Sequence, residues 1–283
     1  MDEFKKKLGN KDFKRLSKFI HQTLGIKMPN SKQLMVESRL SKRVRLLKLK
    51  SFTDYCDFLF SKEGMENELE ELINAITTNK TDFFREPEHF NHLVNTTLPQ
   101  LITKNGTGIR KKLIIWSCGC STGMEAYTIA MILTEFSSRH PGLNFDFMIL
   151  ATDVSPKVLS IGQKAIYNIE AAEPIPDSFK KKYLLKSKNR SKSLIKIIPE
   201  LRKRVKFREL NLLDNNYHFR ENIDIVFFRN VMIYFNEETK TYILKRIYLN
   251  TRDNGILYIG HSENLSNINP GFKQIAPTIY KKQ

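Results

Sequence analysis

Apolar side chains recur at spacings of three and four residues throughout the first 90 residues of the chain. The clearest examples are Phe13, Leu16, Phe19 and Ile20, followed by Leu69, Leu72, Ile73 and Ile76. This spacing places the apolar side chains on one face of a helix. The pattern therefore predicts an all-α domain of short amphipathic helices over residues 1–90, with breaks near residues 25–30 and Gly64.

A different pattern begins at residue 113, where compact apolar runs alternate with helical stretches. The runs cover residues 113–118, 145–151, 205–207, 223–228 and 256–259. Short continuous apolar runs are typical of strands buried on both faces, and the intervening helices suit parallel crossover connections. We therefore predict a doubly wound α/β domain over residues 113–283, which a linker at residues 91–112 separates from the helical domain.

Two stretches depart from this simple division. In the linker, we expect a helix from Phe90 towards Leu101, and the glycine-containing residues 104–108 are the best candidate for the break itself. Within the α/β domain, the alternation is interrupted at about residues 170–208. The apolar segment at residues 194–198 predicts a strand in a small inserted β-subdomain.

Composition narrows the class of protein. With 41% hydrophobic residues, 27% charged residues, 12 Gly and 10 Pro, the chain is of the folded globular kind, not collagen, coiled coil or disordered. No apolar run approaches the ~20 residues that span a bilayer, and no signal-peptide core follows the charged start, so we expect a cytoplasmic protein. Cys56, Cys118 and Cys120 lack the partners of a disulfide framework or a zinc site, so we expect reduced cysteines and no metal.

The charge of the chain is unevenly distributed. Lys and Arg number 47 against 30 Asp and Glu, which gives a net charge of +17. Residues 1–50 carry 15 basic and four acidic side chains, whereas residues 51–90 carry three basic and ten acidic ones. Residues 180–208 carry 13 basic side chains and a single acid, Glu200. The two basic stretches indicate an acidic partner, although charge alone does not identify its kind.

Chemistry-bearing residues follow the first two predicted strands. A glycine turn at residues 119–123 joins a strand to a helix, as in the first βα unit of a nucleotide site. The next strand ends at Asp153, whose carboxylate can accept hydrogen bonds from both hydroxyls of a ribose. Two alternatives stay open. Asp153 could instead cap the helix that begins near Ser155, and Ser121 with His261 could form a hydrolase elbow, which the early position of Asp153 disfavours.

Polar side chains also follow the next two predicted strands of the sheet. Arg229, Asn230 and Tyr234 lie where ligands of open α/β sheets bind, outside the carboxyl ends of the strands. Tyr234 is either a ligand contact or a buried aromatic residue whose hydroxyl has a partner in the protein. Asn211 and Leu212 have the corresponding position after the preceding strand, where a plain turn is an equal alternative.

Six sequence blocks occur in order along nearly the whole chain. They cover residues 35–43, 77–86, 116–123, 151–153, 229–235 and 260–264. Together they resemble the CheR family of chemotaxis receptor methyltransferases. The resemblance implies an all-α N-terminal domain and a Rossmann-like methyltransferase domain with a small inserted antiparallel β-subdomain. It also implies that S-adenosylmethionine esterifies specific receptor glutamates and leaves S-adenosylhomocysteine as product.

The resemblance assigns roles that the patterns alone leave open. It implies cofactor contacts for Asn79, Thr81, Arg85, Glu125, Asp153, Asn211, Leu212, Arg229 and Asn230. Arg85 would pair with the methionine carboxylate of the cofactor. We expect Tyr234 to face the incoming carboxylate and methyl group as the catalytic residue. Arg39, Lys42 and Arg43 would dock the Glu-rich helical bundle of the receptor.

The sequence departs from the family at two places and leaves some questions open. Ala126 replaces a usual proline, and the arginine cluster that some members carry after the Phe-Phe-Arg-Glu motif is missing. A nucleic-acid methyltransferase is a competing class, but the Asn-Val-Met-Ile-Tyr segment at residues 230–234 lacks its usual Pro-Pro pair, so we expect no nucleic-acid partner. We expect a monomer that is peripheral to its membrane receptor. Whether the β-subdomain binds a receptor C-terminal peptide stays open.

Overall fold

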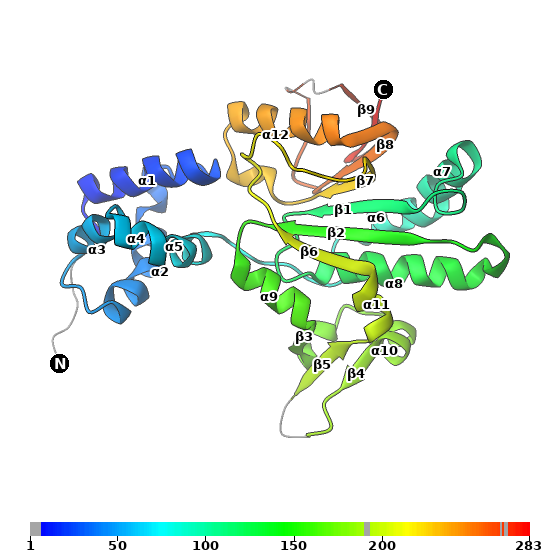
Figure 1. Ribbon diagram of the computed structural model, residues 1–283, viewed down its shortest axis with the longest axis horizontal. Helices are drawn as coiled ribbons and strands as arrows, with labels where there is room; N and C mark the ends of the chain where they lie inside the picture. Colours follow the sequence, from blue (N-terminus) through cyan, green and yellow to red (C-terminus); the bar gives the residue numbers. More distant parts are fainter. Residues whose placement is uncertain (1–6, 190–192, 267, 269–270) are drawn as a thin grey trace.

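The structure, a computed structural model, describes residues 7–189, 193–266, 268 and 271–283 of the chain. Residues 1–6 of the charged start and residues 190–192 of the second basic stretch lie outside the described residues. A unit of short helices lies beside a larger α/β unit (Figure 1). Among the described residues, no helix has the length and apolar character needed to cross a membrane.

The helical unit is formed by the predicted amphipathic segments. Its elements are α1 (Asn10–Leu24), the 3₁₀ turn η1 (Asn30–Lys32), α2 (Gln33–Leu46), α3 (Phe52–Leu59), α4 (Lys62–Asn67) and α5 (Leu69–Ile76). Local sequence sets their ends. Gly25 ends α1 in the left-handed conformation, and the hydroxyls of Ser51 and Ser61 cap α3 and α4. The apolar faces form one buried cluster that includes Phe13, Leu16, Ile20, Leu72 and Ile76.

The α/β unit contains one seven-stranded sheet. Its strands are β1 (Leu113–Cys118), β2 (Phe147–Asp153), β6 (Val205–Glu209), β7 (Ile223–Phe228), β8 (Thr251–Ile259), β9 (Phe272–Ala276) and β10 (Ile279–Lys282). The order is β6-β2-β1-β7-β8-β10-β9, and the first five strands are parallel. The five predicted strands and the doubly wound arrangement are therefore confirmed. The antiparallel strands β9 and β10 extend the sheet beyond the prediction.

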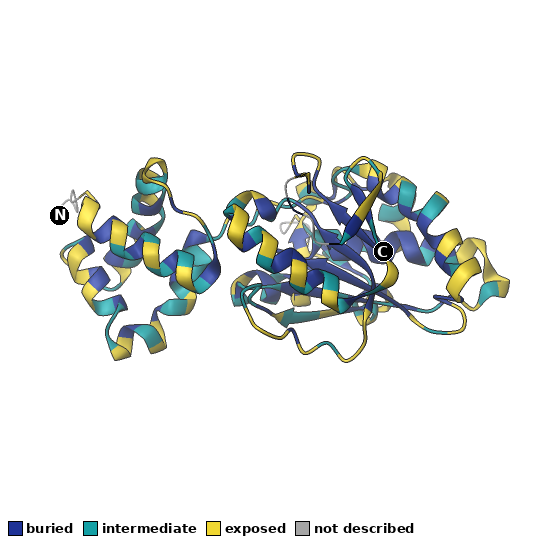
Figure 2. Ribbon diagram, turned by 90° about the horizontal axis from the view of Figure 1, so that it is seen from above, coloured by how far each residue is buried: buried dark blue, intermediate teal, exposed yellow. Residues whose placement is uncertain are grey.

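Helices cover both faces of this sheet. They include α8 (Met124–Arg139), α9 (Pro156–Lys164), α11 (Pro199–Arg204) and α12 (Glu237–Asn250), with the 3₁₀ turn η3 (Pro141–Leu143) after α8. Leu113 and Ile115 of β1 belong to one apolar cluster, whereas Ile114 and Trp116 belong to the other. This alternation follows from the two-residue period of a strand. Figure 2 shows the buried strands between partly exposed helices.

The segment that we expected to be a linker is part of the α/β unit. It contains α6 (Pro87–His92), the π-helical turn η2 (Leu93–Thr97) and α7 (Leu98–Asn105). Phe90, Leu93, Leu98 and Leu101 are buried in the cluster that covers one face of the sheet. Because these four side chains pack in the core of the α/β unit, the segment belongs to that unit. We therefore propose that the domain boundary lies in residues 77–82, before this segment.

The inserted β-subdomain is present. It consists of β3 (Ile166–Asn168), the 3₁₀ turn η4 (Ile169–Ala172), α10 (Asp177–Tyr183), β4 (Leu184–Lys186) and β5 (Leu194–Ile197). The strands form an antiparallel sheet in the order β3-β5-β4. Glu135 on α8 accepts hydrogen bonds from Lys182 Nζ at 2.8 Å and Tyr183 OH at 2.6 Å, which attaches the insert to the main unit. The insert begins at Ile166, before the expected residue 170, and residues 205–208 belong to β6 of the main sheet, so both bounds lie earlier in the chain than expected.

Candidate active site

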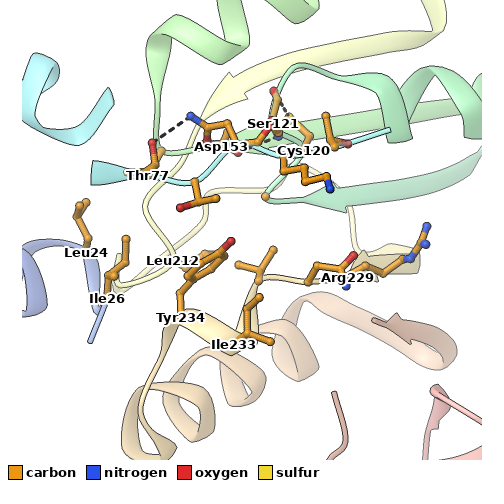
Figure 3. Close-up of a pocket in the computed structure, with 18 of the residues that line it drawn as sticks. Leu24, Ile26, Thr77, Cys120, Ser121, Asp153, Leu212, Arg229, Ile233 and Tyr234 are labelled. Carbon is orange, nitrogen blue, oxygen red and sulfur yellow. Dashed lines mark hydrogen bonds between the residues drawn. The ribbon is translucent and has the colours of Figure 1, made fainter. Parts of the chain in front are cut away.

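A cavity of about 290 Å³ lies between the helical unit and the carboxyl ends of β1, β2, β6 and β7 (Figure 3). All ten residues with a predicted cofactor or catalytic role line it, namely Asn79, Thr81, Arg85, Glu125, Asp153, Asn211, Leu212, Arg229, Asn230 and Tyr234. They come from five separate segments of the chain. The fold therefore gathers the predicted residues around one space, while their individual roles stay predictions.

The helical unit closes one side of the cavity. Leu24 and Ile26, at and after the end of α1, lie beside Tyr234 in Figure 3. The backbone N–H of Lys27 donates to the carbonyl oxygen of Tyr234 at 2.9 Å. Ile26 also forms an isolated antiparallel bridge with Phe235. Contact with the helical unit, more than 200 residues earlier in the chain, therefore helps to hold the Tyr234 backbone in place.

The glycine turn after β1 is shaped by close approaches. Gly119 and Gly123 have φ angles of +74° and +85°, and a Cβ on Gly119 would come within 2.6 Å of the Val231 side chain. The N–H groups of Gly119 and Cys120 donate to the Thr152 carbonyl oxygen at 2.9 and 2.8 Å. Only glycine fits such a turn without strain. The turn therefore brings bare backbone to the edge of the cavity.

Asp153 closes this turn from the end of β2. Its Oδ2 accepts the N–H of Ser121 at 2.9 Å, and its Oδ1 accepts the N–H of Ser155 at 3.1 Å. Burial raises the pKa of the Asp153 carboxyl, although these backbone N–H groups oppose the shift. The side chain that caps α9 is Ser155, whose Oγ accepts from Val158 N. Helix capping by Asp153 is therefore not its role.

The hydrolase alternative does not fit the geometry. The hydroxyl of Ser121 donates to the backbone carbonyl of Asn79 at 2.8 Å. His261 lies elsewhere, with its Nε2 at 4.0 Å from a Glu86 oxygen and 3.9 Å from a Glu88 oxygen. A nucleophilic serine needs its hydroxyl within hydrogen-bonding reach of the base. The G-x-S-x-G match is thus a consequence of the glycine turn.

Arg229 lines the cavity, but its guanidinium is paired with two protein carboxylates. Its guanidinium is buried, with Nη2 at 3.0 Å from Glu86 Oε2 and Nη1 at 3.2 Å from Glu125 Oε2. The Ser117 hydroxyl donates to the other Glu125 oxygen at 2.7 Å. Burial raises the pKa of Glu125, and the Arg229 charge opposes this shift. Figure 3 shows the Arg229 side chain extending away from Tyr234, so we interpret Arg229 as a support for neighbouring residues.

Two asparagines of the predicted set also use their side chains within the protein. Asn211 donates from Nδ2 to the Thr23 carbonyl oxygen at 2.7 Å, which connects the helical unit to the loop after β6. Its Oδ1 accepts the N–H of Leu213 at 3.0 Å. Asn79 donates from Nδ2 to Thr77 Oγ1 at 3.2 Å. Arg85 differs, because its contact with Glu86 Oε1 is 3.9 Å long and its side chain is 36% exposed.

Two of the three predicted docking residues have structural partners. Arg39 donates from Nη1 to the carbonyl oxygen of Ile76 at 2.6 Å, which caps the end of α5. Arg43 forms a two-point ion pair with the buried Glu68, at 2.9 Å from Nε and 2.6 Å from Nη2. Lys42, by contrast, is exposed. Both guanidiniums therefore stabilise the helical unit itself, and a docking role for Arg39, Lys42 and Arg43 stays a prediction.

Lys32 is a cavity residue that the sequence did not single out. Its Nζ lies 5.8 Å from the centre of the Tyr234 ring and donates to the Lys27 carbonyl oxygen at 3.3 Å. Burial lowers the pKa of Lys32, and the charges of Lys27 and Arg39 act in the same direction. One signal in the sequence was its place in the first basic stretch, directly before α2. That signal did not separate it from 14 other basic residues.

Glu86, His89 and His261 bring three atoms of the metal-ligand type within 4.8 Å of one another. The nearest cation to Glu86 among the described residues is the Arg229 guanidinium, at 3.0 Å, with Arg85 at 3.9 Å. Burial, together with the charge of Arg229, lowers the pKa of His89 to about 3, so its imidazole is neutral near physiological pH. We interpret these side chains as the surroundings of Arg229 and propose no metal site.

A mostly parallel sheet with a glycine turn after β1 and a carboxylate at the end of β2, both facing one cavity, is typical of Rossmann-like domains that bind a nucleoside cofactor, the class that includes Rossmann-like methyltransferases. Two family models match the chain. Residues 11–77 match "CheR methyltransferase, all-alpha domain", and residues 79–281 match "CheR methyltransferase, SAM binding domain". The chain therefore belongs to the CheR methyltransferase family, and S-adenosylmethionine is its cofactor.

Curated relatives match over almost their full length. A chemotaxis protein methyltransferase of Borreliella burgdorferi is 40% identical over 271 residues, which cover 96% of this chain and 94% of the relative. Chemotaxis protein methyltransferase 2 of Pseudomonas aeruginosa is 36% identical, with 95% and 92% covered. The Escherichia coli chemotaxis protein methyltransferase is 33% identical, with 96% and 91% covered. The expected family and fold class are thus confirmed.

Proposed function

We propose that this protein transfers a methyl group to the side-chain carboxylate of specific glutamates in chemoreceptors, forming glutamate methyl esters and S-adenosylhomocysteine. The observation that carries the proposal is the single cavity that unites the predicted cofactor residues with Tyr234 and Lys32. One side of this cavity suits a nucleoside and an amino acid. The other side presents a phenol and an ammonium group, which suit an acidic side chain.

The residues present fit the cofactor. Asp153 is an acceptor-only carboxylate whose two oxygens each keep lone pairs after accepting from Ser121 and Ser155, as a ribose diol requires. Among the described residues, the nearest carboxylate oxygen to the Arg85 guanidinium is Glu86 Oε1, at 3.9 Å. The guanidinium therefore suits the methionine carboxylate as a partner. Leu212 and Val231 add apolar side chains to the cavity lining. The site therefore matches the two ends and the middle of S-adenosylmethionine.

The chemistry asks mainly for positioning. The sulfonium group of S-adenosylmethionine supplies an activated methyl group. A glutamate side chain is ionised near neutral pH, so the protein needs no strong general base to make it nucleophilic. Leu24, Ile26 and Met28 make one side of the cavity apolar. An apolar, dry surrounding favours a reaction in which two opposite charges are neutralised.

Lys32 is the cation that we propose for the substrate carboxylate. We expect Lys32→Gln to lower kcat/KM for the receptor about tenfold, because a half-buried ammonium group beside Tyr234 attracts the carboxylate more strongly than an exposed one. S-adenosylhomocysteine affinity should stay within about twofold. Lys27→Gln is the matched control, since Lys27 is exposed and outside the cavity lining. Equal losses in both variants would remove the special role of Lys32.

We expect the receptor helix to bind the exposed side of α2. Leu34, Lys42, Arg45 and Leu46 are exposed there, whereas Arg39 and Arg43 have partners inside the unit. We expect Lys42→Glu to slow methylation three- to tenfold at low salt, with a smaller effect at high salt, because long-range attraction is screened. Lys245→Glu on α12 changes the net charge equally and should have no such effect. Equal slowing by both variants would contradict a docking role.

The decisive test of the proposed function is a transfer assay. Incubation with tritiated S-adenosylmethionine and chemoreceptor-containing bacterial membranes should label a receptor band. Methyl esters of carboxyl groups are released by mild alkali, so the label should be lost as volatile methanol. Label that resists alkali, or label in RNA or DNA, would contradict the proposal. The basic stretch at residues 180–208 makes the nucleic-acid arm of this assay informative.

A further inference from the structure

The segment that follows β7 is shaped from outside the cavity. Asn230 has a φ angle of +60°, a conformation that non-glycine residues adopt only with support from their surroundings. Its backbone N–H donates to Glu263 Oε2 at 2.9 Å, and that oxygen also accepts the N–H of Gly260 at 2.7 Å. Two residues later the 3₁₀ turn η5 (Met232–Tyr234) begins and carries Tyr234 to the cavity. The direction of Tyr234 thus depends on how Asn230 is fixed.

Glu86 fixes the side chains at the start of this segment. Its Oε2 accepts from Arg229 Nη2 at 3.0 Å and Nε at 3.3 Å, and its Oε1 accepts from Asn230 Nδ2 at 3.2 Å. The carboxylate is only 11% exposed and is not among the residues that line the cavity. Each oxygen thus faces a different residue of the segment. Among the described residues, no other carboxylate accepts hydrogen bonds from both the Arg229 and the Asn230 side chains.

Glu86 also connects this segment to the cofactor side of the cavity. It directly follows Arg85, and it has a φ angle of +55°, so both ends of the Glu86–Asn230 contact are in the left-handed conformation. The carbonyl oxygen of Arg85 accepts a further hydrogen bond from Arg229 Nη2. A shift of the 229–234 segment would therefore disturb the backbone that carries Arg85. This contact connects the segment that carries Tyr234 to the segment that carries Arg85.

We propose that Glu86 is a positioning residue that sets the 229–234 segment, and through it Tyr234, against the cofactor side of the cavity. The inference rests on the proposed function for its kinetic consequence and on geometry alone for its structural one. Removing the carboxylate leaves Arg229 with Glu125 as its partner at 3.2 Å, so the fold has a remaining ion pair. The variant would lose the one carboxylate that holds both the Arg229 and the Asn230 side chains. Because small displacements of reacting groups have large effects on rate, this loss should slow methyl transfer.

Glu86→Gln and Glu86→Asp test this assignment together. The amide presents one acceptor instead of two, and the shorter Asp keeps the charge but loses the reach to both residues. We expect both variants to lower kcat about 10- to 100-fold, with S-adenosylhomocysteine affinity changed less than about threefold. Full activity of Glu86→Asp would show that only the charge is needed and would overturn the proposal. Glu135→Gln is the control, because Glu135 is also a buried, hydrogen-bonded carboxylate but lies away from the cavity.

Hydrogen–deuterium exchange gives a measurement that needs no receptor. In Glu86→Gln, the amides of residues 230–235 should exchange at least about tenfold faster than in the unmodified protein, and in Glu135→Gln they should not. Unchanged exchange in Glu86→Gln would overturn the inference. Absence of methyl transfer by the unmodified protein would instead overturn the proposed function, so the two failures are distinguishable. A double-mutant cycle with Asn230→Ala should be non-additive, and additive losses would contradict action through Asn230.

Discussion

Replacement of Asp153 by alanine is expected to weaken S-adenosylhomocysteine binding by about 100-fold or more. A hydrogen bond to a charged group contributes about 1.5–3 kcal/mol, and a ribose diol offers two of them to one carboxylate. The loss has a second source, because Asp153 also accepts the N–H of Ser121 and so supports the glycine turn. Isothermal titration calorimetry with S-adenosylhomocysteine measures the change directly.

A carboxylate at the opposite end of the same strand provides the control. Asp146 directly precedes β2 and forms ion pairs with Arg204 and Lys112. We expect Asp146→Asn to leave the dissociation constant within about twofold, since this side chain does not line the cavity. An unchanged dissociation constant in Asp153→Ala would contradict the ribose assignment, even if methyl transfer were reduced.

The pH dependence of binding gives Asp153 a second signature. Burial raises the pKa of its carboxyl above the ordinary value, so protonation begins at a higher pH than for an exposed aspartate. The protonated group loses acceptor capacity, and affinity for S-adenosylhomocysteine should therefore fall as the pH decreases from neutral through this raised pKa. Because burial also raises the pKa of Glu125, the Asp153→Ala variant should show a weaker pH dependence, not a flat one.

The parts of the fold that the sequence predicted are those whose environment is uniform. The central parallel strands β1 and β7 are buried at every residue, so each is a nearly continuous apolar run in the sequence, whereas β6 at the edge is shorter and partly exposed. β9 was missed because Lys273, Gln274 and Ile275 are exposed on this edge strand, which gives no apolar run. A helix towards Leu101 was predicted, but its apolar residues did not reveal that α7 packs on the sheet. Its burial depends on side chains of the sheet that are distant in sequence.

In the candidate site too, the sequence predicted the position of a residue only where a local pattern determines it. The positions of Asp153 and Asn230 were predictable because Asp153 ends β2 and Asn230 lies just beyond β7, and parallel strands bring their carboxyl ends to one edge. Arg39 and Arg43 looked like a free basic surface because their partners, Ile76 and Glu68, lie 37 and 25 residues away. A charge pattern along one helix does not reveal partners of this kind. The acidic excess of residues 51–90 was the compensating charge, at least for Arg43.

Tyr234→Phe is expected to lower kcat about 10- to 100-fold without changing S-adenosylhomocysteine affinity. The position of residue 234 is set by its backbone contact with Lys27 N at 2.9 Å and by apolar packing, so removal of the hydroxyl should leave the ring in place. We expect the variant to lose one hydrogen bond, the one proposed from the phenol to the substrate carboxylate. A hydrogen bond to a charged group contributes about 1.5–3 kcal/mol, which corresponds to the expected decrease in kcat if the bond orients the reacting carboxylate.

The control for this variant is Tyr242→Phe. Tyr242 packs against the same apolar cluster, and its hydroxyl donates to Asn215 Oδ1 at 3.0 Å outside the cavity. Both variants remove one phenolic hydroxyl, so a general effect on stability would appear in both melting temperatures. We expect only Tyr234→Phe to slow methyl transfer at saturating cofactor and receptor. Full turnover by Tyr234→Phe would reject a role for the hydroxyl and would leave Lys32 as the group that orients the carboxylate.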